Sequence, residues 1–152
     1  MNDLKIISGG QTGVDQGALD FALDQNLKCG GYCPKGRKSE KGTIPYRYPV
    51  TEIESEEYFE RTKRNIVESD GTLILKDKIE IRNGVLDTVN LCKQLSKPYK
   101  IVNIDTSEQN KEVMNWIFEL DIQILNIAGN RESVNPDIRR KVYLFLINLF
   151  KG

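Results

Sequence analysis

Apolar residues recur along this chain in two periods, which alternate from one end to the other. Short apolar runs typical of buried strands occupy five stretches, at 4–8, 27–32, 72–75, 99–104 and 122–128. Apolar residues three and four positions apart predict five helices, at 14–22, 55–68, 85–92, 113–120 and 136–149. This alternation predicts an α/β fold of three layers, with a mainly parallel five-stranded sheet and helices on both faces.

The boundaries of some elements carry their own signals. Asn135 followed by Pro136 is typical of an N-cap and first helical residue, so we expect the last helix to start there. Thr12 with Asp15 three residues later fits the N-cap and acidic third position of the first helix. The segment 33–53 is long and irregular, and its tyrosines Tyr46 and Tyr48 favour an ordered loop that folds over a site.

Length and composition predict one domain that covers residues 1–152. The chain has 152 residues and no internal repeat, 39% of them are apolar, and no apolar run approaches the ~18 residues needed to cross a bilayer. The sequence enters its first strand almost at once, which predicts that it has no signal peptide. Three cysteines at no familiar disulfide or metal spacing favour a reduced cytoplasmic setting and predict no metal site.

The charges narrow the possible functions. The chain has 22 basic and 22 acidic residues, a formal net charge of zero, which argues against a nucleic-acid partner. The basic residues Arg61, Lys63 and Arg64 are best interpreted as a solvated helix face. The chain has no histidine, so it cannot use Ser-His-Asp or Cys-His catalysis, and any proton transfer would fall to carboxylates, lysine or tyrosine.

The segment between the first strand and the first helix is the strongest candidate for a binding site. A glycine turn at this position leaves backbone N–H groups and the positive end of a helix facing outward, an arrangement that favours an anion such as phosphate. The spacing is neither a dinucleotide fingerprint nor a P-loop. The glycines could also serve a sharp turn alone. The candidate residues are Gly9, Gly10, Gln11, Thr12 and Gly13.

Three further loops leave the carboxyl ends of predicted strands, where open α/β sheets bind ligands. They add candidate ligand contacts, and the residues are Lys35, Gly36, Arg37, Asn83, Gly84, Arg131, Glu132 and Ser133. Each has an alternative interpretation: the 35–38 run could be a solvated face, and Arg131 could pair with Glu132 or a neighbouring loop. Asp15 could cap its helix or bind a donor on the ligand.

Six stretches of the chain, in order and over nearly its whole length, resemble one protein family. They are Ser8-Gly9-Gly10-Gln11-Thr12-Gly13-Val14-Asp15-Gln16-Gly17-Ala18-Leu19, Gly31-Tyr32-Cys33-Pro34-Lys35-Gly36-Arg37, and the segments 44–49, 58–65, 69–74 and 125–133. Together they resemble the molybdenum cofactor carrier family, also described as the circularly permuted YpsA branch of the SLOG superfamily. The resemblance implies a Rossmann-like fold whose loops bind a nucleotide-like or phosphorylated ligand.

The same resemblance implies several possible roles. Some relatives carry molybdenum cofactor, a pterin with a terminal phosphate; more distant ones cleave nucleotide N-glycosidic bonds or bind single-stranded DNA, and many are oligomeric. The chain departs from the family pattern at two positions. Gln16 stands where a basic residue is frequent, and 82–88 replaces a Gly-Gly-Thr-type phosphate turn. Arg82 could compensate with its charge.

These observations favour a non-catalytic carrier of a phosphorylated small molecule, nucleotide-like or a pterin phosphate, with molybdenum cofactor as a possible cargo. The alternative is an enzyme that hydrolyses an N-glycosidic bond, with Glu132, Asp15 and Glu40 as candidate acids or bases. We expect a cytoplasmic homo-oligomer, a dimer or tetramer. The sequence leaves the identity of the ligand open.

Overall fold

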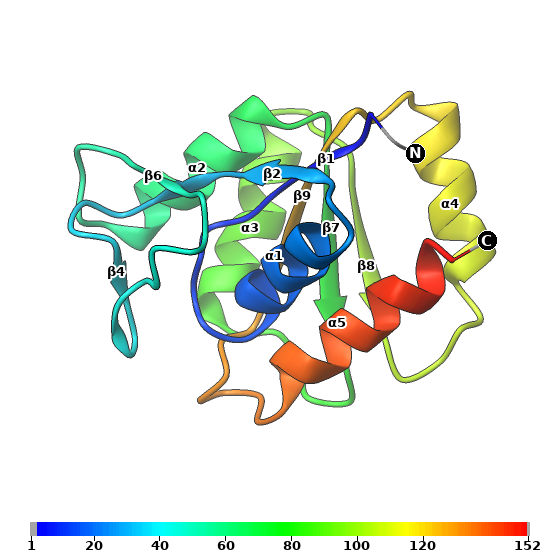
Figure 1. The fold of residues 1–152 in the computed structure, drawn as a ribbon. Helices are drawn as coiled ribbons and strands as arrows, with labels where there is room; N and C mark the ends of the chain where they lie inside the picture. The colour runs from blue at the N-terminus through cyan, green and yellow to red at the C-terminus, as the bar shows by residue number, and fades with distance from the viewer. Residues whose placement is uncertain (1–2, 152) are drawn as a thin grey trace.

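The central feature of the fold is a five-stranded parallel sheet, seen in a computed structural model that describes residues 3–151 (Figure 1). Its strands are β1 (Lys5–Ile7), β2 (Lys28–Gly30), β7 (Gly71–Lys76), β8 (Tyr99–Asn103) and β9 (Ile124–Gly129). The order across the sheet is β2-β1-β9-β7-β8, and each neighbouring pair is parallel. The α/β fold predicted from the alternating periods is confirmed.

Helices cover both faces of this sheet. They are α1 (Val14–Asp24), α2 (Tyr58–Glu68), α3 (Asn83–Gln94), α4 (Asn110–Glu119) and α5 (Ile138–Leu149). Alternate residues of β7 face opposite sides, as the pleat of a strand requires. Leu73 and Leu75 belong to the core with α1, α4 and α5, whereas Ile74 packs with Val85 and Val89 of α3. The result is the predicted three-layer arrangement.

The path of the chain through the sheet determines where a ligand can bind. From β1 the chain moves outward to β2, then crosses to β7 and β8, and finally returns through β9 into the gap between β1 and β7. The strand order therefore reverses around β9. The loops after β1, β7 and β9 diverge from this point, at the edge where open α/β sheets bind ligands.

The irregular segment between β2 and α2 contains four two-residue strands. β3 (Tyr32–Cys33) pairs in parallel with β6 (Thr51–Glu52), and β4 (Lys38–Ser39) forms a small antiparallel hairpin with β5 (Gly42–Thr43). Arg37 organises this segment, because its buried guanidinium donates hydrogen bonds to the carbonyls of Ile44, Pro45, Tyr48 and Val50. Of the two tyrosines in this segment, Tyr48 is fully buried, whereas Tyr46 is 81% exposed.

Several predicted boundaries of strands and helices were wrong. The second strand ends at Gly30, because Gly31 has φ +126° and passes so close to Ser8 that a Cβ there would lie 2.0 Å from its carbonyl oxygen. Helix α2 begins at Tyr58 rather than residue 55. Helix α5 begins at Ile138, not at Asn135–Pro136, because Asp137 is left-handed with φ 71°.

The capping role expected of Thr12 was also wrong. The N-cap of α1 is Gly13 and carries no side-chain cap, while the Thr12 hydroxyl bonds to Glu40 of the 38–43 hairpin.

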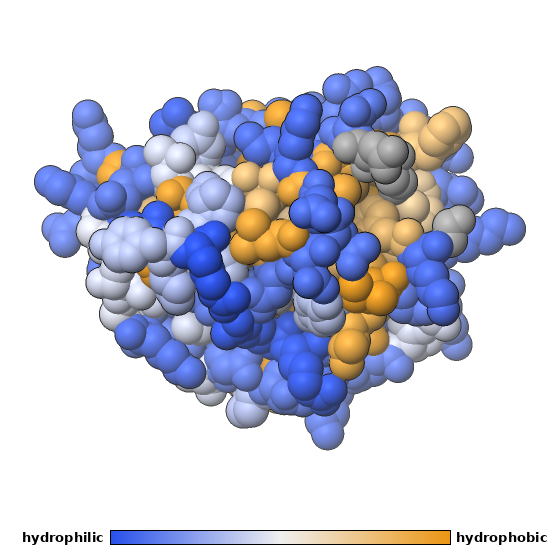
Figure 2. All heavy atoms as spheres, in the orientation of Figure 1, coloured by the Kyte–Doolittle hydropathy of each residue, from blue (hydrophilic) through white to orange (hydrophobic). Residues whose placement is uncertain are grey.

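The face of the molecule in Figure 2 is mostly polar. Figure 2 shows a largely hydrophilic face, with apolar side chains grouped near its centre and over α5. Within residues 3–151, no helix is both long and apolar enough to span a membrane. The homo-oligomer expected from the sequence remains a prediction, which light scattering on purified protein would test.

Candidate ligand-binding site

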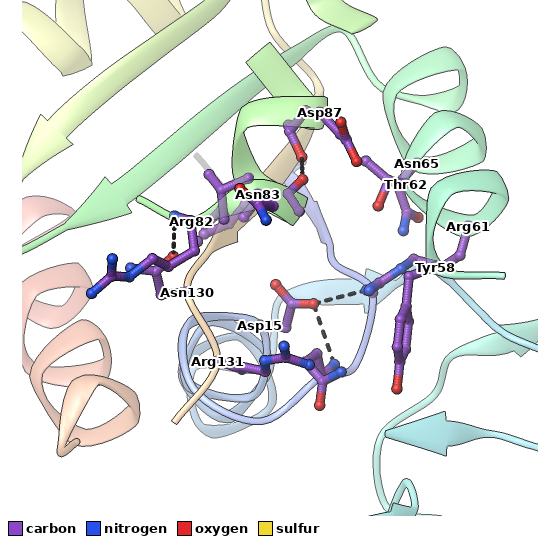
Figure 3. A pocket seen from close by; sticks show the side chains of 18 of the residues that line it. Asp15, Tyr58, Arg61, Thr62, Asn65, Arg82, Asn83, Asp87, Asn130 and Arg131 are labelled. Carbon is purple, nitrogen blue, oxygen red and sulfur yellow. Dashed lines mark hydrogen bonds and ion pairs between the residues drawn. The ribbon is translucent and has the colours of Figure 1, made fainter. Parts of the chain in front are cut away.

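A cavity of about 390 Å³ lies at the edge of the sheet where the strand order reverses. The end of β9 forms its floor, α2 and the first turns of α3 form two walls, and the loops after β1 and β9 complete it (Figure 3). The lining residues combine charge with apolar surface; among them are Asp15, Tyr58, Arg61, Arg82, Val85, Asp87, Ala128 and Arg131. This volume lies within the range typical of small-molecule sites.

A buried ion pair joins α1 to α2 at one wall of the cavity. Nη1 of Arg61 lies 3.0 Å from Oδ2 of Asp15, and the two side chains are 11% and 9% exposed. Oδ2 of Asp15 also accepts the backbone N–H of Gln11 at 3.2 Å. Figure 3 shows the two side chains pointing toward each other from separate elements. The Asp15 carboxylate thereby accepts a backbone N–H of the glycine turn after β1. We expected this N–H to face the anion of a ligand.

Burial has the largest effect on the pKa of Asp15. It raises the pKa of the Asp15 carboxyl above its ordinary value, while the Arg61 guanidinium and the Gln11 N–H oppose that rise. Gly9 makes the arrangement possible, because a Cβ at Gly9 would lie 1.4 Å from Nη1 of Arg61.

The opposite wall is the amino-terminal end of α3. Asn83, Gly84 and Val85 form its first turn and line the cavity, so the positive end of the helix dipole faces the space. Asn130 fixes this wall from β9: its Oδ1 accepts the Arg82 N–H at 3.0 Å and its Nδ2 donates to the Glu80 carbonyl at 2.9 Å. Asn83 and Gly84 thus belong to α3, which the sequence predicted to begin at residue 85.

Next to the cavity, four donors from two loops surround the carboxylate of Glu40. The Thr12 hydroxyl donates to it, as do the backbone N–H and the hydroxyl of Ser133. Nε of Arg131 lies 3.7 Å from Oε1 of Glu40, and Arg131 also lines the cavity. Arg131 therefore pairs with a neighbouring loop, which was one of the two alternatives to ligand contact.

The structure brings some of the sequence candidates together and separates others. Those at or beside the cavity are Gly9, Gln11, Thr12, Asn83, Gly84, Arg131 and Ser133. Gly10 and Gly13 have positive φ, at +78° and +84°, and shape the turn by packing against Ile44 and the Asn130 backbone.

The remaining candidates have structural partners in place of a ligand. The lining of the cavity does not include Lys35, Gly36 or Arg37. The guanidinium of Arg37 donates its hydrogen bonds to backbone carbonyls. Glu132 accepts the N–H groups of Asp137 at 2.7 Å and Arg139 at 3.0 Å, which makes it the cap of α5. An acid–base role for Glu132 would require breaking that cap.

Sequence reasoning missed the contribution of α2. Arg61 was interpreted as part of a solvated face with Lys63 and Arg64, but it is buried, whereas the other two are exposed. The helical period could have indicated this, because Arg61 and Asn65 are four residues apart and therefore lie on one side of the helix. Asn65 is next to the buried Ile66. Asn126 in β9 was missed because an asparagine between apolar residues gives no sign of its partner. Asn130 belongs to the loop after β9 that the sequence indicated, but the partners of its side chain could not be predicted.

The fold and site define an open α/β protein of Rossmann type with a small-molecule-sized cavity at its topological switch point. Residues 6–150 match the model of the circularly permutated YpsA SLOG family, so the chain belongs to that family. It is 37% identical to a protein named putative molybdenum carrier protein from Syntrophus aciditrophicus SB, whose crystal structure superposes with a TM-score of 0.89. That match covers 96% of this chain and 94% of the other. No curated protein shows a significant sequence match.

Proposed function

We propose that the chain binds and carries a phosphorylated small molecule in the cavity between α2 and α3. The observation that supports this most is the set of positive groups around a cavity of about 390 Å³: Arg82, Arg131 and the first turn of α3 all line it. A guanidinium can bind a phosphate through two parallel hydrogen bonds, and a helix N-terminus adds backbone donors. The name of the similar Syntrophus protein is consistent with a carrier role.

The apolar part of the cavity limits the class of ligand. Tyr58, Val85 and Ala128 line the cavity and offer apolar surface against which a planar ring can pack, next to the arginines that would hold a phosphate. A nucleotide-like compound and a pterin phosphate both combine these two features. Molybdenum cofactor is such a pterin phosphate, and as cargo it would reach the protein already assembled.

A thermal-shift screen tests the proposal. Purified protein is heated with nucleoside monophosphates, nucleotide sugars and pterin phosphates, each beside its unphosphorylated counterpart. A ligand at roughly 100 times its Kd adds about 2.7 kcal/mol of stability. Arg82→Ala should weaken the binding of a hit by about 1–3 kcal/mol, whereas Arg64→Ala, an exposed arginine paired with Glu68 on α2, should leave it unchanged.

Two outcomes would count against this function. One is the absence of any shift with phosphorylated compounds at millimolar concentration. The other is a hit whose affinity is the same in wild type and Arg82→Ala, because the ligand would then lie outside the cavity.

One observation favours the hydrolase as a second candidate. Asp15 lines the cavity and burial raises its pKa, as expected of a carboxyl that exchanges a proton with substrate. Its contact with Arg61 instead suits a structural pair. Incubation with nucleoside monophosphates separates the two functions: release of free base that Asp15→Asn abolishes, with binding intact, would favour the enzyme.

A further inference from the structure

The environment of Glu40 is that of a bound anion. Three hydrogen bonds reach its carboxylate, from the Thr12 hydroxyl and from the N–H and hydroxyl of Ser133, and the Arg131 guanidinium adds its charge. The Glu40 side chain is 13% exposed, so it is largely withdrawn from water. Burial opposes its ionisation, but the hydrogen bonds from Ser133 and Thr12 outweigh burial and lower the pKa of the carboxyl.

The donors come from the two loops that a ligand at the switch point would meet. Thr12 precedes α1, and Arg131 and Ser133 follow β9, the strand next to β1 in the sheet. Two hydroxyls, one backbone N–H and one guanidinium are a donor set that suits the oxygens of a phosphate as well as those of a carboxylate. Arg131 also lines the cavity, so this set is continuous with it.

The carboxylate comes from a small peripheral hairpin. β4 and β5 have two residues each and pair with each other in a separate two-stranded sheet. Beyond the Glu40 carboxylate, this tip is fastened to the glycine turn by the Glu40 N–H, which donates to Oε1 of Gln11 at 3.0 Å. The neighbouring residues Lys41, Gly42 and Thr43 are exposed. Moving the tip would therefore leave the central sheet and its helices intact.

We propose that Thr12, Arg131 and Ser133 form a phosphate subsite of the cavity and that Glu40 is its internal competitor, displaced with the 38–43 hairpin when phosphate enters. The inference rests on the proposed function, because the phosphate belongs to the ligand of the same cavity. This competition makes the hairpin a selective gate, because an entering anion must bind the subsite more strongly than the Glu40 carboxylate does. A phosphate dianion meets this condition, since it has more charge and more acceptor oxygens.

The test uses inorganic phosphate as the probe. Isothermal titration calorimetry compares wild type with Glu40→Ala, which removes the competitor, and with Glu40→Gln, which neutralises it at nearly constant shape. We expect Glu40→Ala to bind phosphate about tenfold or more tightly than wild type, with a smaller gain in Glu40→Gln. Adding Ser133→Ala to Glu40→Ala should remove most of the gain, because one subsite donor is then lost.

The matched control is Glu54→Ala, which removes an exposed carboxylate from the same irregular segment. It changes net charge equally, so an equal gain in this variant would overturn the inference by showing a nonspecific effect. A folded Glu40→Ala without a gain would also overturn it, since Glu40 would then be a structural clamp. If Glu40→Ala does not fold, Glu40→Gln decides by the same criterion.

The two proposals can fail separately. Phosphorylated compounds that bind wild type in an Arg82-dependent way, together with Glu40 variants that gain no phosphate affinity, would overturn the subsite and leave the carrier function standing. Tighter phosphate binding in the Glu40 variants, with no phosphorylated compound bound to wild type, would support the subsite and reject the carrier function.

Discussion

At the scale of single residues, the Asp15–Arg61 pair is the most consequential interaction of the site. Removing one partner of a buried ion pair leaves the other charge unpaired, at a cost of about 3–5 kcal/mol. We therefore expect Arg61→Met to lower the free energy of unfolding by that amount near neutral pH, measured by urea denaturation. Arg64→Met is the control on the same helix; its pair with Glu68 is exposed and should contribute less than about 1 kcal/mol.

The same variant makes a prediction about pH. The pKa of Asp15 in the folded state lies above its ordinary value, so the folded state holds the carboxyl proton more tightly than the unfolded state does. The free energy of unfolding therefore falls as the pH rises from the ordinary pKa to the folded pKa. Without Arg61 the pKa rises further. The deficit of Arg61→Met should therefore be constant at pH values below the folded pKa of Asp15 in wild type, and should widen as the pH rises above that pKa. A deficit independent of pH would mean that lost packing, not the unpaired carboxylate, causes it.

Gly9 should act through Arg61. A methyl group at Gly9 would overlap the guanidinium, and Gly9 is not among the glycines with positive φ, so backbone strain does not explain its presence. We expect Gly9→Ala to destabilise wild type by several kcal/mol, on the order of the ion-pair cost. In the Arg61→Met background the added cost should largely disappear, and a double-mutant cycle measures this coupling. Additive costs would contradict the prediction.

At the scale of elements, the first turn of α3 serves both the helix and the cavity. A Cβ at Gly84 would meet no heavy atom within 4 Å, and Gly84 lines the cavity. Alanine has a higher helix propensity than glycine, so Gly84→Ala should raise the free energy of unfolding by about 0.5–1 kcal/mol. The added methyl group should weaken ligand binding. Asn90→Ala, an exposed position further along α3, should leave ligand affinity unchanged. Stabilisation with unaltered affinity would place the ligand away from this turn.

Helix α5 depends on Glu132 for its start. Loss of the two hydrogen bonds from Asp137 and Arg139 should make Glu132→Ala less stable by about 1–2 kcal/mol in urea denaturation. Glu119→Ala, an exposed carboxylate at the end of α4, should change stability by less than about 0.5 kcal/mol. Unchanged stability in Glu132→Ala would contradict the capping role. Ligand binding should survive, because Glu132 does not line the cavity.

The sequence predicted elements better than their ends, and for a physical reason. Apolar periodicity reports which side of a segment is buried, and this was enough for the five main strands and five helices. The start of α5 depended instead on a left-handed Asp137 and on Glu132, whose partners are five and seven residues away. The glycine pair Gly30-Gly31 indicated a weak point in the second strand, but the close approach of Gly31 to Ser8 depends on a residue that no local pattern reveals.

At the scale of the whole molecule, topology explains both the success and the failure of the site prediction. Loops that follow parallel strands must meet at one edge, so Gly9, Gly84 and Arg131 could be grouped from the sequence. The same rule says nothing about helices that cross that edge. Arg61 of α2 is part of the site, whereas Arg37 lies outside it and donates hydrogen bonds to carbonyls of its own segment. Tertiary packing, which the sequence pattern does not reveal, determines the position of each arginine.

The cavity therefore exists only while separate crossovers keep their relative positions, and Asn130 is the link that ties two of them. It is 4% exposed and joins the end of β9 to the β7–α3 loop through the Arg82 N–H and the Glu80 carbonyl.

Asn130→Ala should cost about 1–3 kcal/mol in urea denaturation, because both backbone groups lose a buried partner. Ligand affinity should fall as well, since Arg82 and the first turn of α3 are no longer held against β9. Val142→Ala, a core change on the α1–α5 side, should cost comparable stability and keep the affinity. Equal affinity in the two variants would mean that the walls of the cavity are positioned independently of each other.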